Sequence, residues 1–228
     1  AMAISLFYAG YFLLMLVSLE TTTALNTGAL YTLVPLITAI LCIFIFKEKV
    51  TFVQAVVYII GIIGTCGVVF NADFNLFLSF TLNSGDYVFL VAIFFMAFYS
   101  ISMKLLYKDD NPILLVFCTL LGGAIWMAMV IIATNTPLNW QMITGELFWY
   151  MVYLVVGTTL ITLYLNQKAV LVLGPKSIMS YIYINPAVVA IFAYFLDGEK
   201  ISFEVFIAIL VSAAATLILQ ISLNKRDV

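Results

Sequence analysis

The sequence predicts an all-α fold: a polytopic transmembrane helix bundle with eight spans of an expected ten, arranged as two inverted five-helix repeats of which the first is incomplete. Apolar residues make up 65% of the 228 positions and charged residues only 9%, so the chain lacks the polar surface of a soluble globule. The apolar residues form unbroken runs of about 20 residues, which is the length of a bilayer-crossing helix. One of these runs is repeated further along the chain.

The first three expected spans are followed by charged or turn-forming residues. They cover 1–19, 25–46 and 52–70. Lys47-Glu48-Lys49 follows the second span, and Asn71-Ala72-Asp73 follows the third. A membrane β-barrel would instead show segments of about ten residues with alternating polarity. The unbroken runs therefore predict helices.

Five further spans follow in the same manner. They cover 87–107, 113–133, 147–165, 177–196 and 202–223. The breaks between them hold the charges and the turn formers, which are Lys108 to Pro112, Gly174-Pro175-Lys176 and Asp197-Gly198-Glu199-Lys200.

The basic residues are distributed asymmetrically about these spans. If every span crosses the membrane, the segments between successive spans lie alternately on its two sides. One side then holds eight basic residues, which are Lys47, Lys49, Lys104, Lys108, Lys168, Lys176, Lys225 and Arg226. The other side receives only Lys200, together with Glu20, Asp73, Asp86, Glu146, Asp197 and Glu199. Because membrane proteins retain basic residues on the cytoplasmic side, we expect the basic side and both ends of this chain to be cytoplasmic. We expect the membrane to be a bacterial inner (plasma) membrane.

Several classes of function are disfavoured by the composition. The three cysteines lie inside apolar runs without metal-ligand spacing, and the chain has no histidine, so intramembrane proteases and metalloenzymes are not indicated. A net charge of −2 without a basic patch argues against nucleic acid as a partner. We therefore expect no enzyme, no catalytic residue, no metal and no cofactor. The expected partners are membrane lipids and a small-molecule metabolite, and a homodimer stays open.

An internal repeat relates two distant stretches. PLITAILCIFIFKEKVTF, from Pro35 to Phe52, aligns without gaps with PAVVAIFAYFLDGEKISF, from Pro186 to Phe203, and seven of the 18 positions are identical. Proline occurs only five times in the chain, yet one proline aligns here. The alignment continues weakly, since Gly61 and Gly64 correspond to small residues that allow close helix packing. We interpret this as an internal duplication.

The repeat predicts inverted topology. The chain crosses the membrane five times between Glu48 and Glu199, so the two copies lie on opposite sides, as in many secondary transporters. We expect residues 1–72 to hold the last three helices of a first unit and 87–224 the five helices of a second. A linker, 73–86, and a cytoplasmic tail, 225–228, complete the chain. Because the first two helices of the second unit have no counterpart, two further helices are expected ahead of residue 1.

The pattern resembles the EamA-type transporters of the drug/metabolite transporter superfamily, which have ten helices in two inverted five-helix units. The residues that carry the resemblance are Ser18-Leu19, Ala24, Gly28, Pro35 and Glu48, and in the second copy Ala169-Val170, Pro186 and Glu199. The resemblance implies that a small metabolite moves by alternating access through a cavity between the units. It also implies that the chain is truncated at its N-terminus.

Polar side chains within the spans are the candidates for substrate binding, because lipid cannot satisfy them. Tyr31, Pro35 and Thr38 recur at helical spacing, and the missing N–H of a proline frees a backbone carbonyl one turn earlier. The expected substrate-binding residues are Tyr31, Pro35, Thr38, Tyr99, Ser102, Thr158, Thr162, Tyr181, Asn185 and Pro186. Asn166 shares a stripe with Thr158 and Thr162, and Tyr8 and Tyr11 are further candidates on the first span.

Glu48 and Glu199 are candidates for gating, with pairing to Lys47, Lys49 or Lys200 as the simpler interpretation. No carboxylate is expected deep within a span, so no proton relay is indicated. A cavity without an arginine or lysine clamp favours a neutral or zwitterionic metabolite that is amino-acid-like or drug-like. The alternatives are a non-transporting membrane scaffold or an inactive relic of a transporter.

Overall fold

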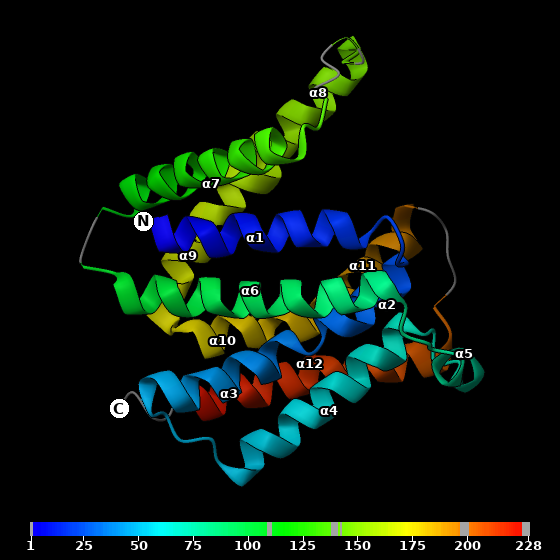
Figure 1. Ribbon diagram of the computed structural model, residues 1–228. Helices are drawn as coiled ribbons and strands as arrows, with labels where there is room; N and C mark the ends of the chain where they lie inside the picture. Colours follow the sequence, from blue (N-terminus) through cyan, green and yellow to red (C-terminus); the bar gives the residue numbers. More distant parts are fainter. Residues whose placement is uncertain (1, 109–110, 138–140, 142, 197–200, 225–228) are drawn as a thin grey trace.

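All regular structure in the described part of the chain is helical, as predicted (Figure 1). The structure is a computed structural model that describes residues 2–108, 111–137, 141, 143–196 and 201–224. The first half contains α1 (Met2–Ser18), α2 (Ala24–Tyr31), α3 (Val34–Phe46), α4 (Phe52–Val69) and α5 (Phe74–Leu78). The second half contains α6 (Ser84–Leu106), α7 (Pro112–Thr134), α8 (Gly145–Tyr153), η2 (Leu154–Ile161), α9 (Thr162–Leu173), α10 (Pro175–Ser180), η3 (Tyr181–Ile184), α11 (Asn185–Leu196) and α12 (Phe203–Asn224).

Within the described ranges, seven helical segments are long and apolar enough to cross a membrane, and α1 is a shorter apolar helix of 17 residues. Together they correspond to the eight expected spans. Large apolar side chains such as Phe44, Phe52 and Phe195 are exposed on the outside of the bundle, which is the arrangement of a protein surrounded by lipid. The expected linker contains the short helix α5, and α6 begins inside it at Ser84.

Helix ends coincide with capping residues. Thr51 begins α4 with a capping box, in which its Oγ1 accepts from the Gln54 N–H at 3.2 Å while its own N–H donates to Gln54 Oε1 at 3.1 Å. Asn83 and Asp86 begin α6 in the same way. At the other end of a span, Lys47 terminates α3 in the left-handed conformation with φ 55°.

Two spans are broken just before their prolines. Between α2 and α3, the N–H groups of Thr32 and Leu33 bond to carbonyls three residues back, and α3 then begins around Pro35. In the second copy, η3 is a 3-10 turn that ends directly before Asn185-Pro186. The two breaks occupy equivalent positions of the sequence repeat.

One expected span is longer than the sequence predicted. The expected 147–165 helix continues to Leu173 through α8, the π-helical η2 and α9. The expected span ended at residue 165, but Gln167 is fully buried in the helix and its Nε2 donates to Thr119 Oγ1 on α7 at 3.1 Å. A buried side-chain hydrogen bond thus allows a polar residue to continue the helix.

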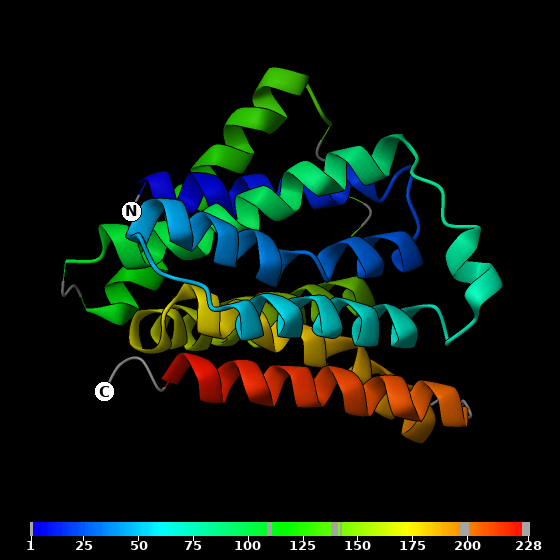
Figure 2. The same ribbon diagram turned by 90° about the horizontal axis from the view of Figure 1, so that it is seen from below.

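Two antiparallel helix pairs organise the bundle, α1 with α6 and α4 with α12 (Figure 2). The second pair packs closely at Gly64, where an added Cβ would lie 2.8 Å from the backbone nitrogen of Ser212. Tyr183 anchors η3 against α4, since its buried hydroxyl donates to the Tyr58 carbonyl at 3.2 Å. Helix α8 has no buried residue and extends away from this packing in Figure 1.

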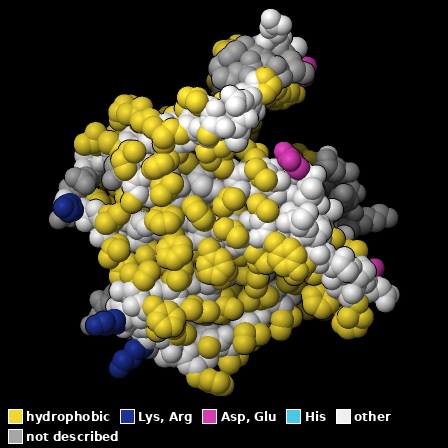
Figure 3. All heavy atoms as spheres, in the orientation of Figure 1, with side chains coloured by type: hydrophobic (Ala, Val, Ile, Leu, Met, Phe, Trp, Pro, Cys, Tyr) yellow, Lys and Arg dark blue, Asp and Glu magenta, His cyan; other side chains and the backbone are white. Residues whose placement is uncertain are grey.

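Charged side chains lie at the two ends of the bundle. Figure 3 shows a broad apolar face, with lysine or arginine side chains gathered at one end and the visible acidic side chains lying away from it. Lys104 lies near the end of α6 and Asp86 near its start. The charge asymmetry seen in the sequence is therefore also an asymmetry in space.

Candidate functional site

Three cavities meet at Tyr31. The largest, here called the seam cavity, has a volume of about 480 Å³ and lies between α2, α4, η3 and α11. A cavity of about 240 Å³, the Tyr11 cavity, lies between α1, α2 and α6. The third, of about 220 Å³, is lined by α1, α2, α6, η2 and α9, and is here called the Asn166 cavity. Tyr31 lines all three, so this one residue borders each of them.

The seam cavity brings the two copies of the repeat together. Tyr31 and Thr32 line it from the break before Pro35, and Asn185 and Pro186 line it from the equivalent break in the second copy. Thr65 of α4 and Asn71 also line it, and the Thr65 hydroxyl donates to its own helix at the Gly61 carbonyl. The cavity therefore lies where two interrupted helices face each other.

The Asn166 cavity is aromatic and contains unpaired polar atoms. Tyr8, Tyr11 and Tyr99 contribute rings, and the centroids of Tyr8 and Tyr99 lie 5.1 Å apart. Asn166 Oδ1 and the Tyr99 hydroxyl are buried without a hydrogen-bond partner among the described residues. Gln167 lies beside the Tyr99 hydroxyl, but no hydrogen bond of acceptable geometry joins them.

Six of the ten expected substrate-binding residues line these cavities. They are Tyr31, Tyr99, Thr158, Thr162, Asn185 and Pro186. Pro35, Thr38 and Ser102 are buried but line none of the three cavities. Thr158 and Thr162 donate their hydroxyls to carbonyls one turn back, at Leu154 and Thr158 respectively, so their acceptor lone pairs are the groups offered to a ligand.

Tyr181 differs from the expectation, since its side chain is 44% exposed and lines none of the three cavities. We expected it to share a face with Asn185 at an α-helical spacing of four residues. The segment Tyr181–Ile184 is instead a 3-10 turn, in which each residue advances by about 120° rather than about 100°. Tyr183 points inward in its place and is fully buried.

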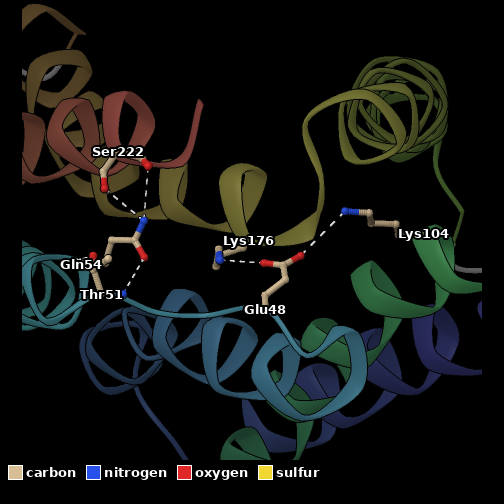
Figure 4. A network of polar contacts seen from close by, with 6 residues as sticks. All are labelled: Glu48, Thr51, Gln54, Lys104, Lys176 and Ser222. Atoms are coloured by element: carbon tan, nitrogen blue, oxygen red, sulfur yellow. Dashed lines mark hydrogen bonds and ion pairs between the residues drawn. The ribbon is translucent and has the colours of Figure 1, made fainter. Parts of the chain in front are cut away.

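Glu48 forms ion pairs with two lysines of the second half of the chain (Figure 4). Its Oε2 lies 2.6 Å from Lys176 Nζ and its Oε1 lies 3.8 Å from Lys104 Nζ. Pairing with Lys47 or Lys49 was the simpler expectation from sequence, whereas Lys104 and Lys176 belong to α6 and α10. The other gating candidate, Glu199, lies outside the described residues.

Local backbone geometry explains how Glu48 reaches these lysines. The left-handed Lys47 turns the chain sharply, and the Glu48 N–H returns to the Cys42 carbonyl at 3.3 Å. Lys176 lies in the first turn of α10, and that helix begins at Pro175, directly after Gly174 with φ 81°. The three charged groups line a cavity of about 510 Å³ at the basic end of the bundle. We call these three residues the Glu48 cluster.

A buried carboxylate joins two elements at the opposite end. Asp86 is fully buried, and it accepts hydrogen bonds from the Thr22 hydroxyl and from Asn26 Nδ2, the latter at 2.8 Å. It also accepts from the Asn83 N–H at 2.8 Å. The sequence placed Asp86 in a loop, because nothing local indicated that the α1–α2 connection would fold over it. We call Asp86, Thr22 and Asn26 the Asp86 cluster.

Comparison with known families decides the family of this chain. The profile of the EamA-like transporter family matches residues 1–70 and 83–221. The chain belongs to the EamA-like transporter family. With its helices of membrane-spanning length and its apolar exterior, this EamA-like chain is a multi-pass integral membrane protein.

One curated relative and one solved structure are similar to this chain. The chain is 22% identical over 202 residues to the uncharacterized transporter YyaM of Bacillus subtilis (strain 168), covering 89% of this chain and 66% of YyaM. The chain thus spans about two thirds of the length of that relative. A solved structure, described only as the crystal structure of a protein, matches with a TM-score of 0.80 and 15% identity, over 99% of this chain and 77% of that one. This likeness shows that the two share a fold.

Replacing Asp86 by Ala in the EamA-like chain is expected to lower the free energy of unfolding by about 2 kcal/mol, because three donors lose their acceptor in a buried environment. The measurement is denaturation in mixed detergent micelles, followed by circular dichroism. Asp73→Ala is the matched control, since Asp73 caps the exposed five-residue helix α5 and should cost at most about 1 kcal/mol. Equal losses for both variants would mean that Asp86 acts only as a helix cap.

Proposed function

We propose that the intact protein transports a small neutral or zwitterionic metabolite, amino-acid-like or drug-like, by alternating access between two inverted units. The observation that carries this proposal is the group of cavities meeting at Tyr31. Their described lining contains tyrosines, threonines and amides but no charged side chain. A substrate with a net charge would have to give up its hydration without a counter-ion, which is costly in a low-dielectric site.

Three structural features support the inverted arrangement of the units α1–α4 and α6–α12. The span breaks before Pro35 and Pro186 are equivalent in the repeat. The helices that follow the two broken spans, α4 and α12, are repeat counterparts and pack against each other. Their close contact joins Gly64 to Ser212, the counterpart of Gly61, so it falls near the same position of both copies. Discontinuous helices beside the substrate path are typical of inverted-repeat transporters.

Alternating access requires contacts that close the path at each end in turn, and the two clusters supply them. The Glu48 cluster joins the α3–α4 connection of the first unit to α6 and α10 of the second. The Asp86 cluster joins the α1–α2 connection to α6. Both clusters contact α6, on which Asp86 and Lys104 are separated by about 27 Å at the rise of an α-helix. Separation of one cluster while the other holds would open the cavities to one side only.

We infer that the basic end faces the cytoplasm of a bacterial inner membrane, following the retention of lysines on that side. Reporter tags placed beside residues 48 and 199 test both the orientation and the inversion. The expected result is a cytoplasmic signal from the tag at 48 and an external signal from the tag at 199. Signals from the same side would contradict the inverted arrangement.

Replacing Tyr31 by Ala is expected to reduce transport about ten-fold, which corresponds to a loss of about 1.4 kcal/mol of interaction, because Tyr31 lines all three cavities. Uptake and counterflow are measured with the intact protein in vesicles against a metabolite panel. Tyr181→Ala is the control, since this exposed tyrosine lies on the same broken span as Asn185 but lines none of the three cavities. No transport of any metabolite by the unmodified protein would favour a scaffold.

A further inference from the structure

The cavity of about 510 Å³ at the basic end of the bundle carries an excess of positive charge. Among its described lining residues, Lys49, Lys104 and Lys176 are basic and Glu48 is acidic. We call it the basic cavity. None of these lining residues borders the three cavities that meet at Tyr31. The basic cavity is therefore separate from the cavities in which a substrate is proposed to bind.

Two of the lysines lie on opposite sides of the Glu48 carboxylate, as Figure 4 shows. Lys176 Nζ lies 2.6 Å from Glu48 Oε2, whereas Lys104 Nζ lies 3.8 Å from Oε1. The longer distance exceeds that of a hydrogen bond, so Lys104 attracts Glu48 without donating to it. Because each ammonium group offers three donors, both lysines retain N–H groups for a second anion.

Lys104 is positioned at the cavity wall and is accessible from the cavity. A Cβ added at Gly174 would lie 3.3 Å from Lys104 Nζ, and the ring centroid of Phe46 lies 5.3 Å from the same nitrogen. The backbone of Gly174 and the aromatic face of Phe46 thus hold the ammonium group in place. Its side chain is nevertheless 42% exposed, so a ligand in the cavity reaches it without displacing packed side chains.

The basic cavity lies at the depth where the spans end. Leu173 and Leu223, which line it, are the last residues of two helical segments long enough to cross a membrane. Pro175, also in its lining, is the first residue of another such segment, and Lys104 lies in the last turn of α6. The ends of membrane-spanning helices lie in the headgroup layer, and basic pockets between such helices bind phosphate-bearing head groups there.

The charge and the surface of the cavity fit a phosphate group attached to an apolar or polyol stem. Lys104 and Lys176 carry two positive charges against the single negative charge of Glu48, and Lys49 adds another ammonium group to the lining. A phosphate group balances this excess, since it adds negative charge and several acceptor oxygens. Leu173 and Leu223 provide an apolar wall for the stem.

We propose that the basic cavity binds a phosphate group, which competes with the Glu48 carboxylate for Lys104 and Lys176. The phosphate belongs to an anionic phospholipid or to a soluble phosphate ester, since both present the same group to the lysines. Glu48 lies in the connection between α3 and α4, whereas the two lysines belong to α6 and α10. An occupied cavity therefore loosens the contact between these parts of the bundle. This site goes beyond the proposed transport function and does not depend on it.

Three probes that carry phosphate in different settings test the proposal: dihexanoylphosphatidylglycerol, dihexanoylphosphatidylcholine and glycerol 3-phosphate. Their binding to the purified intact protein in a neutral detergent is measured by titration calorimetry. We expect the phosphatidylglycerol to bind about ten-fold more tightly than the phosphatidylcholine, equivalent to about 1.4 kcal/mol, because the lysines repel the ammonium group of choline.

Glycerol 3-phosphate identifies the source of the phosphate. Binding as tight as that of the phosphatidylglycerol would assign a soluble phosphate ester, and weaker or absent binding beside a preference for phosphatidylglycerol would assign a lipid. No preference for phosphatidylglycerol over phosphatidylcholine, together with no binding of glycerol 3-phosphate, would overturn the inference.

Matched variants locate the effect. Lys104→Met should weaken binding of the preferred probe several-fold, whereas Lys168→Met removes the same charge from α9 outside the cavity lining and should leave binding unchanged. Equal losses in these two variants would indicate general attraction to a basic surface and would overturn the assigned site.

Glu48→Gln tests the competition directly. It should raise the affinity for the preferred probe several-fold, because the competing carboxylate is lost, and an unchanged or lower affinity would contradict competition. Lys104→Met keeps the proposal testable if Glu48→Gln fails to fold, since the side chain of Lys104 is largely at the surface of the cavity.

Binding and transport fail independently in this design. Phosphate binding that depends on Lys104, together with no transport of any metabolite, would retain the site and refute the transporter proposal. Transport of metabolites by a protein that binds none of the three probes would do the reverse.

Discussion

Replacing Glu48 by Ala is expected to lower the free energy of unfolding by about 3 kcal/mol, the lower end of the range for breaking a buried ion pair. The lower end applies because the side chain of Glu48 is 27% exposed and water replaces part of the lost interaction. Lys176 has a side-chain exposure of only 9% and would be left without its partner at 2.6 Å. Lys104 would also lose its carboxylate, so the ammonium groups of Lys49, Lys104 and Lys176 would remain in one cavity without that carboxylate.

A double-mutant cycle measures the interaction energy between Glu48 and Lys176. Glu48→Gln combined with Lys176→Met should recover much of the stability lost in the single variants, because no uncompensated charge then remains buried. The cycle with Lys104→Met is the control and should give a coupling of at most about 0.5 kcal/mol, since Lys104 is 42% exposed and its nitrogen lies 3.8 Å from Glu48. Equal couplings for the two lysines would contradict the assigned role of Lys176.

Replacing Gly64 by Ala is expected to cost about 3 kcal/mol, the upper part of the range for overpacking a well-packed interior. The new Cβ would lie 2.8 Å from the backbone nitrogen and 3.2 Å from the Cα of Ser212. A backbone cannot rotate away as a side chain can, so α4 and α12 must separate. Because these helices belong to the two proposed units, the variant should also reduce transport.

Gly123→Ala is the matched control for Gly64→Ala. Nothing lies within 4 Å of the Cβ that would be added at Gly123 on α7, so the better helix propensity of alanine should leave stability unchanged or raise it by up to about 1 kcal/mol. Both variants are measured by denaturation in mixed micelles. A small loss at Gly64 would show that the α4–α12 contact can relax without consequence.

The spans could be predicted from sequence because the features that create them are local. Long apolar runs, charged breaks and capping residues such as Thr51 and Asn83 act within a few neighbouring positions. The span breaks near Pro35 and Pro186 follow from the missing N–H of proline. Tyr31 and Thr162 could be placed among the cavity-lining residues because polar groups within a membrane must find an interior partner.

Contacts between distant segments could not be predicted in this way. The partners of Glu48 come from α6 and α10, and only the folded arrangement brings them to α3. The sequence alone placed Asp86 in a linker, and its burial depends on contacts with Thr22 and Asn26, which are about 60 residues away in the chain. Tyr181 is exposed and Tyr183 is buried because a 3-10 turn changes the direction of the side chains relative to an α-helix.

The two ends of the bundle are held together by different kinds of force. The Glu48 cluster joins full charges across an open cavity, where dissolved ions screen interactions beyond about 8 Å at physiological ionic strength and weaken closer ones. Asp86 is removed from solvent, and its partners are uncharged donors, so added salt scarcely reaches them. The electrolyte on the basic side would therefore act on one end alone, and in the proposed alternating-access cycle its concentration would bias which end separates first.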